Sequence, residues 1–504
     1  MPARSPFTNP PPRCRVLAAA LLAALVAGCA AGPDYVRPQL DLPPAYKESG
    51  PWKTAEPRAI DPQHPWGELY SDATLNGLID EAGRANQNIR QAEAQYRQAR
   101  AVAAEAHAAF WPSFGGAVGA SRARSNSNGL RLGNDVNAGL NASWEPDLWG
   151  SVRRAIEADD AGAQASADDL AGARLSIQAE LAQDYLQLRV IDLQRDLYAA
   201  TIAAYARSLR LTQSQYAAGV ALRSDVALAE SQLKTAQAQG VDLEASRSQL
   251  EHAIAILLGK APAAFALAPV ALTGAQLQAR LPAIPTGLPS ALLERRPDIA
   301  GAERRVALAN ANIGVARAAF FPSLVLNASG GFNGSALASL FDTPSRVWSL
   351  GGTLAQTLFD GGLRSARSDA AVAAYDVAVA QYKQTVLGGF QQVEDNLAIL
   401  RVLDQESALQ DQAVQASQLA ERSALSQYRA GTATYIAVVT AQTLALANQR
   451  SATQIVGRQL AASVALITAT GGGWAASDPA VAVRAAEPAP VPLARAESEQ
   501  KAHR

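Results

Sequence analysis

The chain repeats itself, and this repeat constrains the fold more than any other feature of its 504 residues. Residues 106–114 read AHAAFWPSF, and residues 316–324 read ARAAFFPSL. The run SQYAAG at 214–219 returns as SQYRAG at 426–431. The matches keep an offset of 210 to 212 residues along the whole chain. A fixed period of this kind predicts two structurally equivalent halves.

Each half reads as a helix, two strands, a long helix and a closing helix. The first helix covers residues 87–111 or 297–321 and stops at Pro112 or Pro322, because proline cannot donate the helical hydrogen bond. Two strands follow, within 113–146 and 322–358. The long helix covers 150–216 or 362–428 and ends in a turn at Gly219 or Gly431. The closing helix covers 224–258 or 434–470.

The strand segments alternate between apolar and polar residues. In the first half, Leu140 and Trp144 share one face, whereas Asn137 and Asn141 share the other. About ten alternating residues suit a tilted strand that crosses a membrane. Aromatic residues at the strand ends are expected to form the interfacial girdle of an outer-membrane barrel: Trp111, Trp144, Trp149, Phe320, Phe321, Trp348 and Phe359.

The helices are rich in alanine and carry apolar heptads, such as Val372, Val379, Val386 and Val393. A sustained heptad period predicts supercoiling against neighbouring helices. At 1.5 Å per residue the long helix reaches roughly 100 Å. The two shorter helices of each half sum to nearly that length, so we expect them to stack end to end beside it. Segments 33–71, 259–288 and 471–504 would then meet at mid-height as a belt.

The first thirty residues predict a lipoprotein leader. Arg13 and Arg15 precede an apolar run that is too short to span a bilayer, and the run ends in Val-Ala-Gly before Cys29. This pattern predicts a signal peptide over 1–28 and acylation of Cys29. By resemblance to lipoprotein sorting rules, the absence of Asp after Cys29 indicates the outer membrane, with the chain extending into the periplasm. No later segment is long and apolar enough for a membrane helix, so strands are expected to make any further crossing.

The predicted division of the chain follows from these elements. An N-terminal linker and belt segment covers 29–86, and the first repeat covers 87–258. A belt connector over 259–296 leads to the second repeat, 297–470. A belt segment and tail over 471–504 ends the chain.

Four strands cannot close a membrane sheet alone, because the outer edges would leave backbone N–H and C=O groups unpaired in lipid. Two copies would give eight strands, whose interior side chains can fill. Three copies give twelve strands and leave a lumen, so a threefold homotrimer is the expected assembly. The fold class is mainly α with membrane β, in which the trimer forms a 12-strand β-barrel and a periplasmic α-helical barrel.

The sequence resembles the TolC-type outer-membrane factors, in particular the NodT/OprM-like lipoproteins of RND efflux systems. The resemblance covers about residues 29–475 and is most specific in LLERRPDI at 292–299. FFPS at 320–323 and LFDGG at 358–362 add to it. It implies a trimeric exit duct for drugs and other toxic compounds. It also implies that a periplasmic membrane-fusion adaptor and an inner-membrane RND pump dock onto the helix tips.

The resemblance also places a periplasmic gate after the second Tyr-x-x-Gly turn, where the family often carries acidic residues. The matching positions are Ala437 and Thr440, so an acidic ring is in doubt. Asp225, with Arg223 nearby, holds the corresponding place in the first half, and a polar latch from Asp225 to Tyr428 or to a neighbouring chain is one hypothesis. The alternative is that Asp225 only caps a helix.

The hairpin turns resemble the contact points for the adaptor. The residues concerned are Tyr216, Gly219, Val220, Gly431 and Thr432. Glycine at these places also suits any helical hairpin, so the turns alone leave both readings open.

Nothing in the sequence predicts an enzyme, a cofactor or a metal site. The four histidines lie far apart, and phosphate-binding and nucleophile motifs are absent. A net charge of −1 gives no basic footprint for nucleic acid. Two alternatives remain open: an outer-membrane duct for type I secretion, and a periplasmic coiled-coil scaffold or adaptor without membrane strands.

Overall fold

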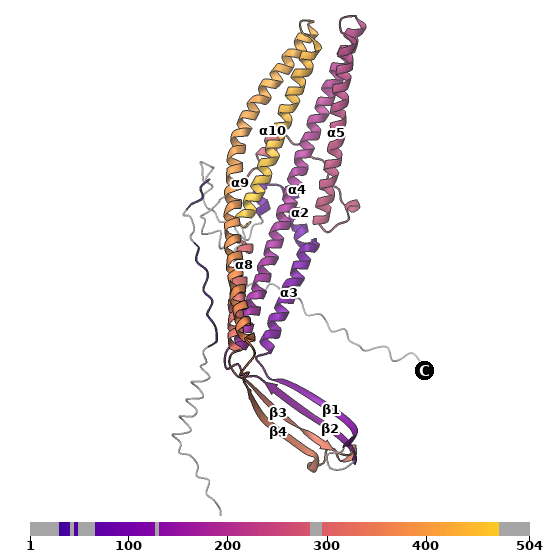
Figure 1. Ribbon diagram of the computed structural model, residues 1–504. Helices are drawn as coiled ribbons and strands as arrows, with labels where there is room; N and C mark the ends of the chain where they lie inside the picture. The colour runs from indigo at the N-terminus through magenta and orange to yellow at the C-terminus, as the bar shows by residue number, and fades with distance from the viewer. Residues whose placement is uncertain (1–29, 41–44, 49–65, 126–130, 283–294, 473–504) are drawn as a thin grey trace, which may run out of the picture.

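Four antiparallel helix segments rise from one end of a four-stranded sheet (Figure 1). A computed structural model describes residues 30–40, 45–48, 66–125, 131–282 and 295–472. The two long helices are α4 (Ser151–Ala217) and α9 (Leu363–Arg429), each of 67 residues. They run from the sheet to the far tips, where they turn into α5 (Arg223–Leu257) and α10 (Tyr435–Ala469). Their bounds lie within one or two residues of those expected.

The helices α3 (Gln87–Ala108) and α8 (Pro297–Ala318) complete the span between mid-height and the sheet. Each lies close to the C-terminal end of a closing helix. The Asn86 side-chain amide, at the start of α3, donates to the Leu257 carbonyl at the end of α5 (2.8 Å). The Arg296 guanidinium, at the start of α8, donates to the Ala469 carbonyl at the end of α10 (3.0 Å). Each bond satisfies a carbonyl that a helix end leaves without an intrahelical partner.

Glycine makes both junctions possible. Gly259 (φ 67°) and Gly471 (φ 92°) occupy the left-handed region just after α5 and α10. A Cβ atom at Gly259 would lie 2.5 Å from the Ala85 carbonyl oxygen, and one at Gly471 would lie 1.8 Å from the Arg295 oxygen. Only glycine therefore lets these backbones meet.

One helix lies in the segment that was expected to be a linker. Helix α2 (Ala73–Ala85) follows the short 3-10 helix η1 (Trp66–Tyr70) and is capped by Asp72. Its buried residues Leu75 and Ile79 join the main core with residues of α4, α5 and α10. Leu75, Leu78, Ile79 and Ala82 recur at the helical spacing i, i+3, i+4 and i+7 behind an Asp72 cap, so the sequence itself carries the signal for this helix.

The sheet has the order β1-β2-β3-β4 and is antiparallel throughout. Ser113 pairs with Ser143, Ser143 with Asn327, and Ser323 with Ala355. Strands β1 and β4 are therefore the two edges of the sheet. The strands are β1 (Ser113–Ser125), β2 (Arg131–Trp144), β3 (Ser323–Gly334) and β4 (Arg346–Ala355).

None of the described helices combines the length and the apolar composition that a bilayer crossing requires.

Candidate functional site

The sheet carries an apolar face and a polar face that run through all four strands. Directly paired residues share a face, so the register aligns the alternation of each strand with that of its neighbour. On the apolar face, Phe114 is 81% exposed and Val118 is 85% exposed. Leu140, Leu350 and Leu354 lie on the same face and are also exposed. A large exposed apolar face of this kind needs an apolar surrounding.

The opposite face is polar. It carries Asn137, Asn141, Asn327, Ser329 and Ser349, and the hydroxyls of Ser329 and Ser349 lie 2.8 Å apart across two strands. The two faces together fit a membrane strand whose outer side meets lipid and whose inner side meets water.

Aromatic residues tie the sheet to the helices, and one of them, Trp149, also joins the two halves. The indole N–H of Trp149 donates to the Pro322 carbonyl (2.6 Å), and its ring stacks on Phe321 at 4.9 Å. The indole N–H of Trp144 donates to the Phe110 carbonyl (3.1 Å). These two tryptophans therefore fix the connection between the sheet and the helices.

The other expected girdle residues are more exposed. Trp111, Phe320 and Phe359 lie at the helical end of the sheet. Trp348 is 78% exposed and pairs with Gly330 near the far end, on the apolar face. The aromatic residues therefore occupy both ends of the sheet, although most lie at the helical end.

The two hairpin tips have the same backbone geometry. Gly219 (φ 72°) and Gly431 (φ 73°) adopt the left-handed conformation. The Val220 N–H donates to the Gln215 carbonyl (2.8 Å), and the Thr432 N–H donates to the Gln427 carbonyl (2.9 Å). This is the ordinary glycine-centred end of a helix.

The side chains of the two tips differ. Tyr216 in the first hairpin is 48% exposed, whereas its counterpart Tyr428 is 6% exposed. The Tyr428 hydroxyl donates to Thr212 (3.3 Å), and its ring lies 5.2 Å from that of Tyr435. Burial raises the pKa of Tyr435 to about 12, and it also raises the pKa of Tyr428. Tyr428 therefore packs between the two hairpins as a neutral phenol.

The gate candidates are spread around this contact. One oxygen of the Asp225 carboxylate accepts from the Leu222 N–H (3.2 Å), which is a capping arrangement at the start of α5. Arg223 is the exposed first residue of α5. Ala437 and Thr440 are exposed on α10, and the Thr440 hydroxyl donates to the Ile436 carbonyl (2.9 Å). Within one chain, Asp225 is thus engaged as a helix cap.

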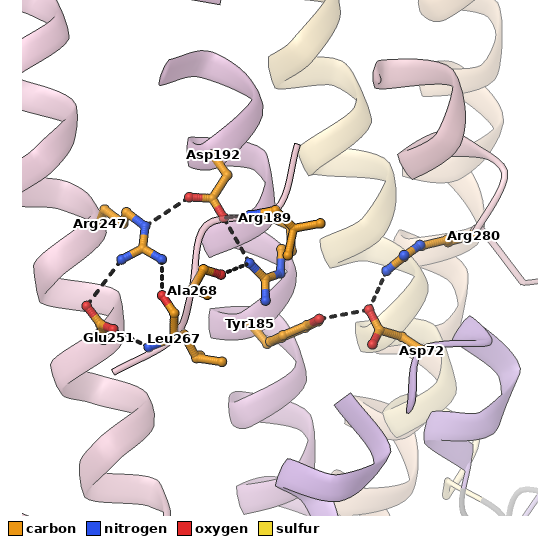
Figure 2. A network of polar contacts seen from close by, with 10 residues as sticks. Asp72, Tyr185, Arg189, Asp192, Arg247, Glu251, Leu267, Ala268 and Arg280 are labelled. Carbon is orange, nitrogen blue, oxygen red and sulfur yellow. Dashed lines mark hydrogen bonds and ion pairs between the residues drawn. The ribbon is translucent and has the colours of Figure 1, made fainter. Parts of the chain in front are cut away.

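A polar network at mid-height was not anticipated from the sequence (Figure 2). Asp192 on α4 is almost fully buried and accepts from Arg189 (2.9 Å) and from Arg247 on α5 (2.9 Å). The Arg189 guanidinium also donates to the Ala268 carbonyl (3.0 Å), and Arg247 donates to the Leu267 carbonyl. Asp192 therefore orients two arginines that hold the belt connector against the helices.

A second carboxylate fixes the other end of the connector (Figure 2). Asp72 accepts from the Tyr185 hydroxyl (2.8 Å) and forms an ion pair with Arg280. Burial alone would raise the pKa of Asp72, but the hydrogen bonds from Tyr185 and from the Leu75 N–H, together with Arg280, lower it. Asp72 therefore stays ionised and ties α2, α4 and the connector together.

The expected acylation site, Cys29, lies outside the described residues, as do the leader, 1–28, and the tail, 473–504. Of the LLERRPDI motif, only residues 295–299 are described. In the described part of the chain, no group of three or more His, Cys, Asp or Glu residues is placed to hold a metal ion.

A two-faced sheet with two open edges, carried on long helical hairpins, defines a subunit of an outer-membrane channel. The chain belongs to the outer membrane efflux protein family, whose family model matches residues 78–260 and 288–472. The expected family, fold class and outer-membrane efflux role are thereby confirmed.

Relatives and solved structures agree with this assignment. The toluene efflux pump outer membrane protein TtgF of Pseudomonas putida is 31% identical over 467 residues, which are 90% of this chain and 96% of TtgF. Outer membrane protein OprJ of Pseudomonas aeruginosa is 33% identical over 466 residues, 90% and 95% of the two chains. The solved outer-membrane channel OprN has a TM-score of 0.82 at 29% identity, covering 88% of this chain and 100% of OprN.

The mid-height network yields a testable prediction. Asp192→Asn removes the charge that pairs with two arginines, and breaking a buried ion pair from one side destabilises a protein by about 3–5 kcal/mol. We expect faster tryptic cleavage at Lys260 and Arg280, which lie in the connector on either side of Leu267 and Ala268, and a lower midpoint of thermal unfolding. Asp196→Asn, one helical turn further along α4, is the control. Equal cleavage rates in the two variants would show that Asp192 does not hold the connector.

Proposed function

We propose that three copies of this chain close into one tube, which serves as the exit duct of a tripartite RND-type efflux system. The observation that carries the proposal is the sheet, with its apolar and polar faces and its two open edges. Edge N–H and C=O groups have no partner in lipid, so β4 of one copy must pair with β1 of the next. Twelve strands then surround a lumen lined by the polar face. The tube conducts passively and, we propose, catalyses no reaction.

The helices support the same assembly. Leu387, Leu409 and Leu419 on α9 are exposed in the single chain. Within the chain, α4 packs on α8 and on α10, so by the repeat α9 is expected to pack on α3 and, toward the tip, on α5 of the partner subunit. Exposed leucines on α9 then become buried between subunits.

The internal repeat also predicts the register of the closing strands. Ser113 and Ser323 are equivalent in the first strands, and Ser143 and Ala355 are equivalent in the second strands. Because Ser143 pairs with Asn327, Ala355 should pair with Ala117 of the partner subunit. Four residues along each strand, Gly351 should then face Ser121 of the partner subunit on the polar side.

Engineered cysteines can test this register. We expect Gly351→Cys combined with Ser121→Cys to form a disulfide between subunits on mild oxidation, because directly paired strand residues lie within disulfide reach. Denaturing electrophoresis without reductant should show covalent dimers and trimers, which reductant should reverse.

The control moves one cysteine along the strand. Gly351→Cys with Ala117→Cys places the two thiols roughly 13 Å apart along the strand and should not cross-link. Cross-linking of this pair, with none for Gly351 and Ser121, would refute the register. A wild-type protein that remains a monomer in mild detergent would refute the trimer itself.

We propose that the helix tips meet the periplasmic adaptor. The first tip exposes Tyr216, Val220 and Leu222, and the second exposes Thr432 and Ile436. Exposed apolar side chains at the end of a long hairpin are suited to a protein contact. The inner-membrane pump would then deliver its substrate into the lumen through the adaptor.

The gate hypothesis concerns Asp225 and Tyr428. Asp225 caps α5 in the single chain, and its charge lies close enough to help raise the pKa of Tyr428. We expect Asp225→Ala to raise the conductance of the trimer in planar bilayers, because a latch residue near the hairpin contact would be lost. Asp242→Ala, on the exposed middle of α5, is the control. Unchanged conductance and drug susceptibility would leave Asp225 as a helix cap only.

We further propose that Cys29 is acylated and anchors the chain in the periplasmic leaflet. Ala30 packs on Gly150 beside the start of α4, and the Ala31 N–H donates to the Trp149 carbonyl (2.9 Å), so the next residues begin at the helical end of the sheet. Mass spectrometry of the N-terminal peptide should find acyl groups, and a Cys29→Ala chain should lack them. An unmodified Cys29 in the outer membrane would refute the anchor.

Family membership and the exposed apolar sheet argue against a purely periplasmic scaffold. A secretion duct would share the tube, but the relatives compared above carry names of efflux or outer-membrane proteins. Deleting the gene and profiling sensitivity to toxic compounds separates the two functions. Loss of a secreted polypeptide without any change in sensitivity would favour secretion.

A further inference from the structure

Arginines interrupt the apolar face of the sheet at its far end. Arg122 pairs with Asn134, Arg124 with Leu132, and Arg346 with Phe332. All three belong to the same alternating set as Val118 and Leu350, so they lie on the apolar face. All three are exposed.

These arginines lack a protein counter-charge within the described residues. None of them forms an ion pair there. Asp135, the acidic residue of the four strands, lies on the polar face, where it accepts from the Asn333 amide (3.4 Å). An arginine on a lipid-facing strand is tolerated near the interface but strongly disfavoured at the midplane. Their place therefore indicates contact with headgroups.

The closing register brings the three together. In the register that pairs Ala355 with Ala117 of the partner subunit, Leu350 pairs with Arg122 of the partner subunit. Trp348 likewise pairs with Arg124 of the partner subunit. Arg346 lies two residues from Trp348 and so is diagonal to Arg124 of the partner subunit. Each seam of the trimer then carries three arginines and one exposed tryptophan, and neither chain alone completes the group.

From these positions we propose that each seam binds the phosphate groups of a phosphorylated glycolipid of the lipid A type. The inference rests on the proposed trimer. Arg122 and Arg124 lie roughly 30–36 Å along β1 from Ser113, at about 3.3 Å per residue. That distance reaches the leaflet opposite the periplasmic helices. Guanidinium groups pair bidentately with phosphate, and tryptophan favours the membrane interface.

The choice of glycolipid over a phospholipid follows from the number of charges. Three arginines spread over two strands suit a headgroup with two separate phosphates better than a single phosphodiester. The outer leaflet of a bacterial outer membrane presents such a glycolipid, and the periplasmic leaflet does not.

The test measures lipid binding to the purified wild-type trimer and to variants in detergent. Lipid A is titrated in, and native mass spectrometry counts the lipids bound to each trimer. We expect the triple variant R122Q/R124Q/R346Q to bind lipid A at least about tenfold more weakly, since each basic residue near a charged lipid surface contributes to affinity. The Lys version, R122K/R124K/R346K, should retain most of the binding.

Two controls separate the phosphate site from general effects. R84Q/R90Q/R97Q removes the same number of exposed arginines from α2 and α3 and should bind lipid A like the wild type. Dephosphorylated lipid A, with the same acyl chains, should bind the wild type no better than it binds the triple Gln variant. Phosphatidylglycerol is the phospholipid arm and should bind more weakly than lipid A.

The outcomes distinguish this inference from the trimer. Equal binding of lipid A by the wild type and the triple Gln variant, with both trimeric, overturns the site. Equal binding of phosphatidylglycerol and lipid A overturns the choice of a glycolipid. If the triple Gln variant does not form trimers, the Lys version and the single substitutions decide, and failure of the wild type to form trimers refutes the proposed function instead.

Discussion

The backbone N–H and C=O groups on the outer edges of β1 and β4 determine how this chain must assemble. A sheet of four strands with one strongly apolar face cannot remain open in lipid, because each unpaired backbone group there costs several kcal/mol. The chain therefore depends on copies of itself, and the internal repeat makes that possible. The pairing of β2 with β3 inside one chain already has the geometry that the pairing of β4 with β1 of the next subunit must repeat. The lumen is a consequence of closure.

In the helical part, shorter helices are joined end to end at mid-height. Each half needs a helix as long as α4 or α9 beside it, but it supplies two shorter helices instead. Asn86 and Arg296 join these pieces by donating to the end carbonyls of α5 and α10. The belt connector is then held across the joint by Asp192 and Asp72. The polar belt thus keeps the stacked helices in line while the apolar heptads pack them side by side.

Much of this architecture could be predicted because it depends on periodic or punctuating residues. Pro112, Pro322, Gly219 and Gly431 marked helix ends, and alternation marked the strands. Helix α2 carries the same kind of periodic signal, although its segment was expected to be a linker, whereas the Asp192 network could not be predicted in this way. Asp192 lies among other charged residues on α4, such as Arg195 and Asp196, so nothing in the local sequence singles it out, and its partners lie up to 78 residues away. Contacts between distant residues leave no local period, so only the fold reveals them.

The same reasoning explains why the gate and the tips resist prediction from the repeat. Equivalent positions in the two halves share backbone geometry, yet Tyr216 faces outward while Tyr428 is buried against Tyr435. Arg223 stands where the second half has Tyr435, so the first hairpin lacks the ring on which its own tyrosine could pack. The six helical hairpins of the proposed trimer share one backbone geometry but therefore end in two kinds of tip. A closed tube requires the two halves to share their backbone geometry. Recognition and gating become possible where their side chains differ.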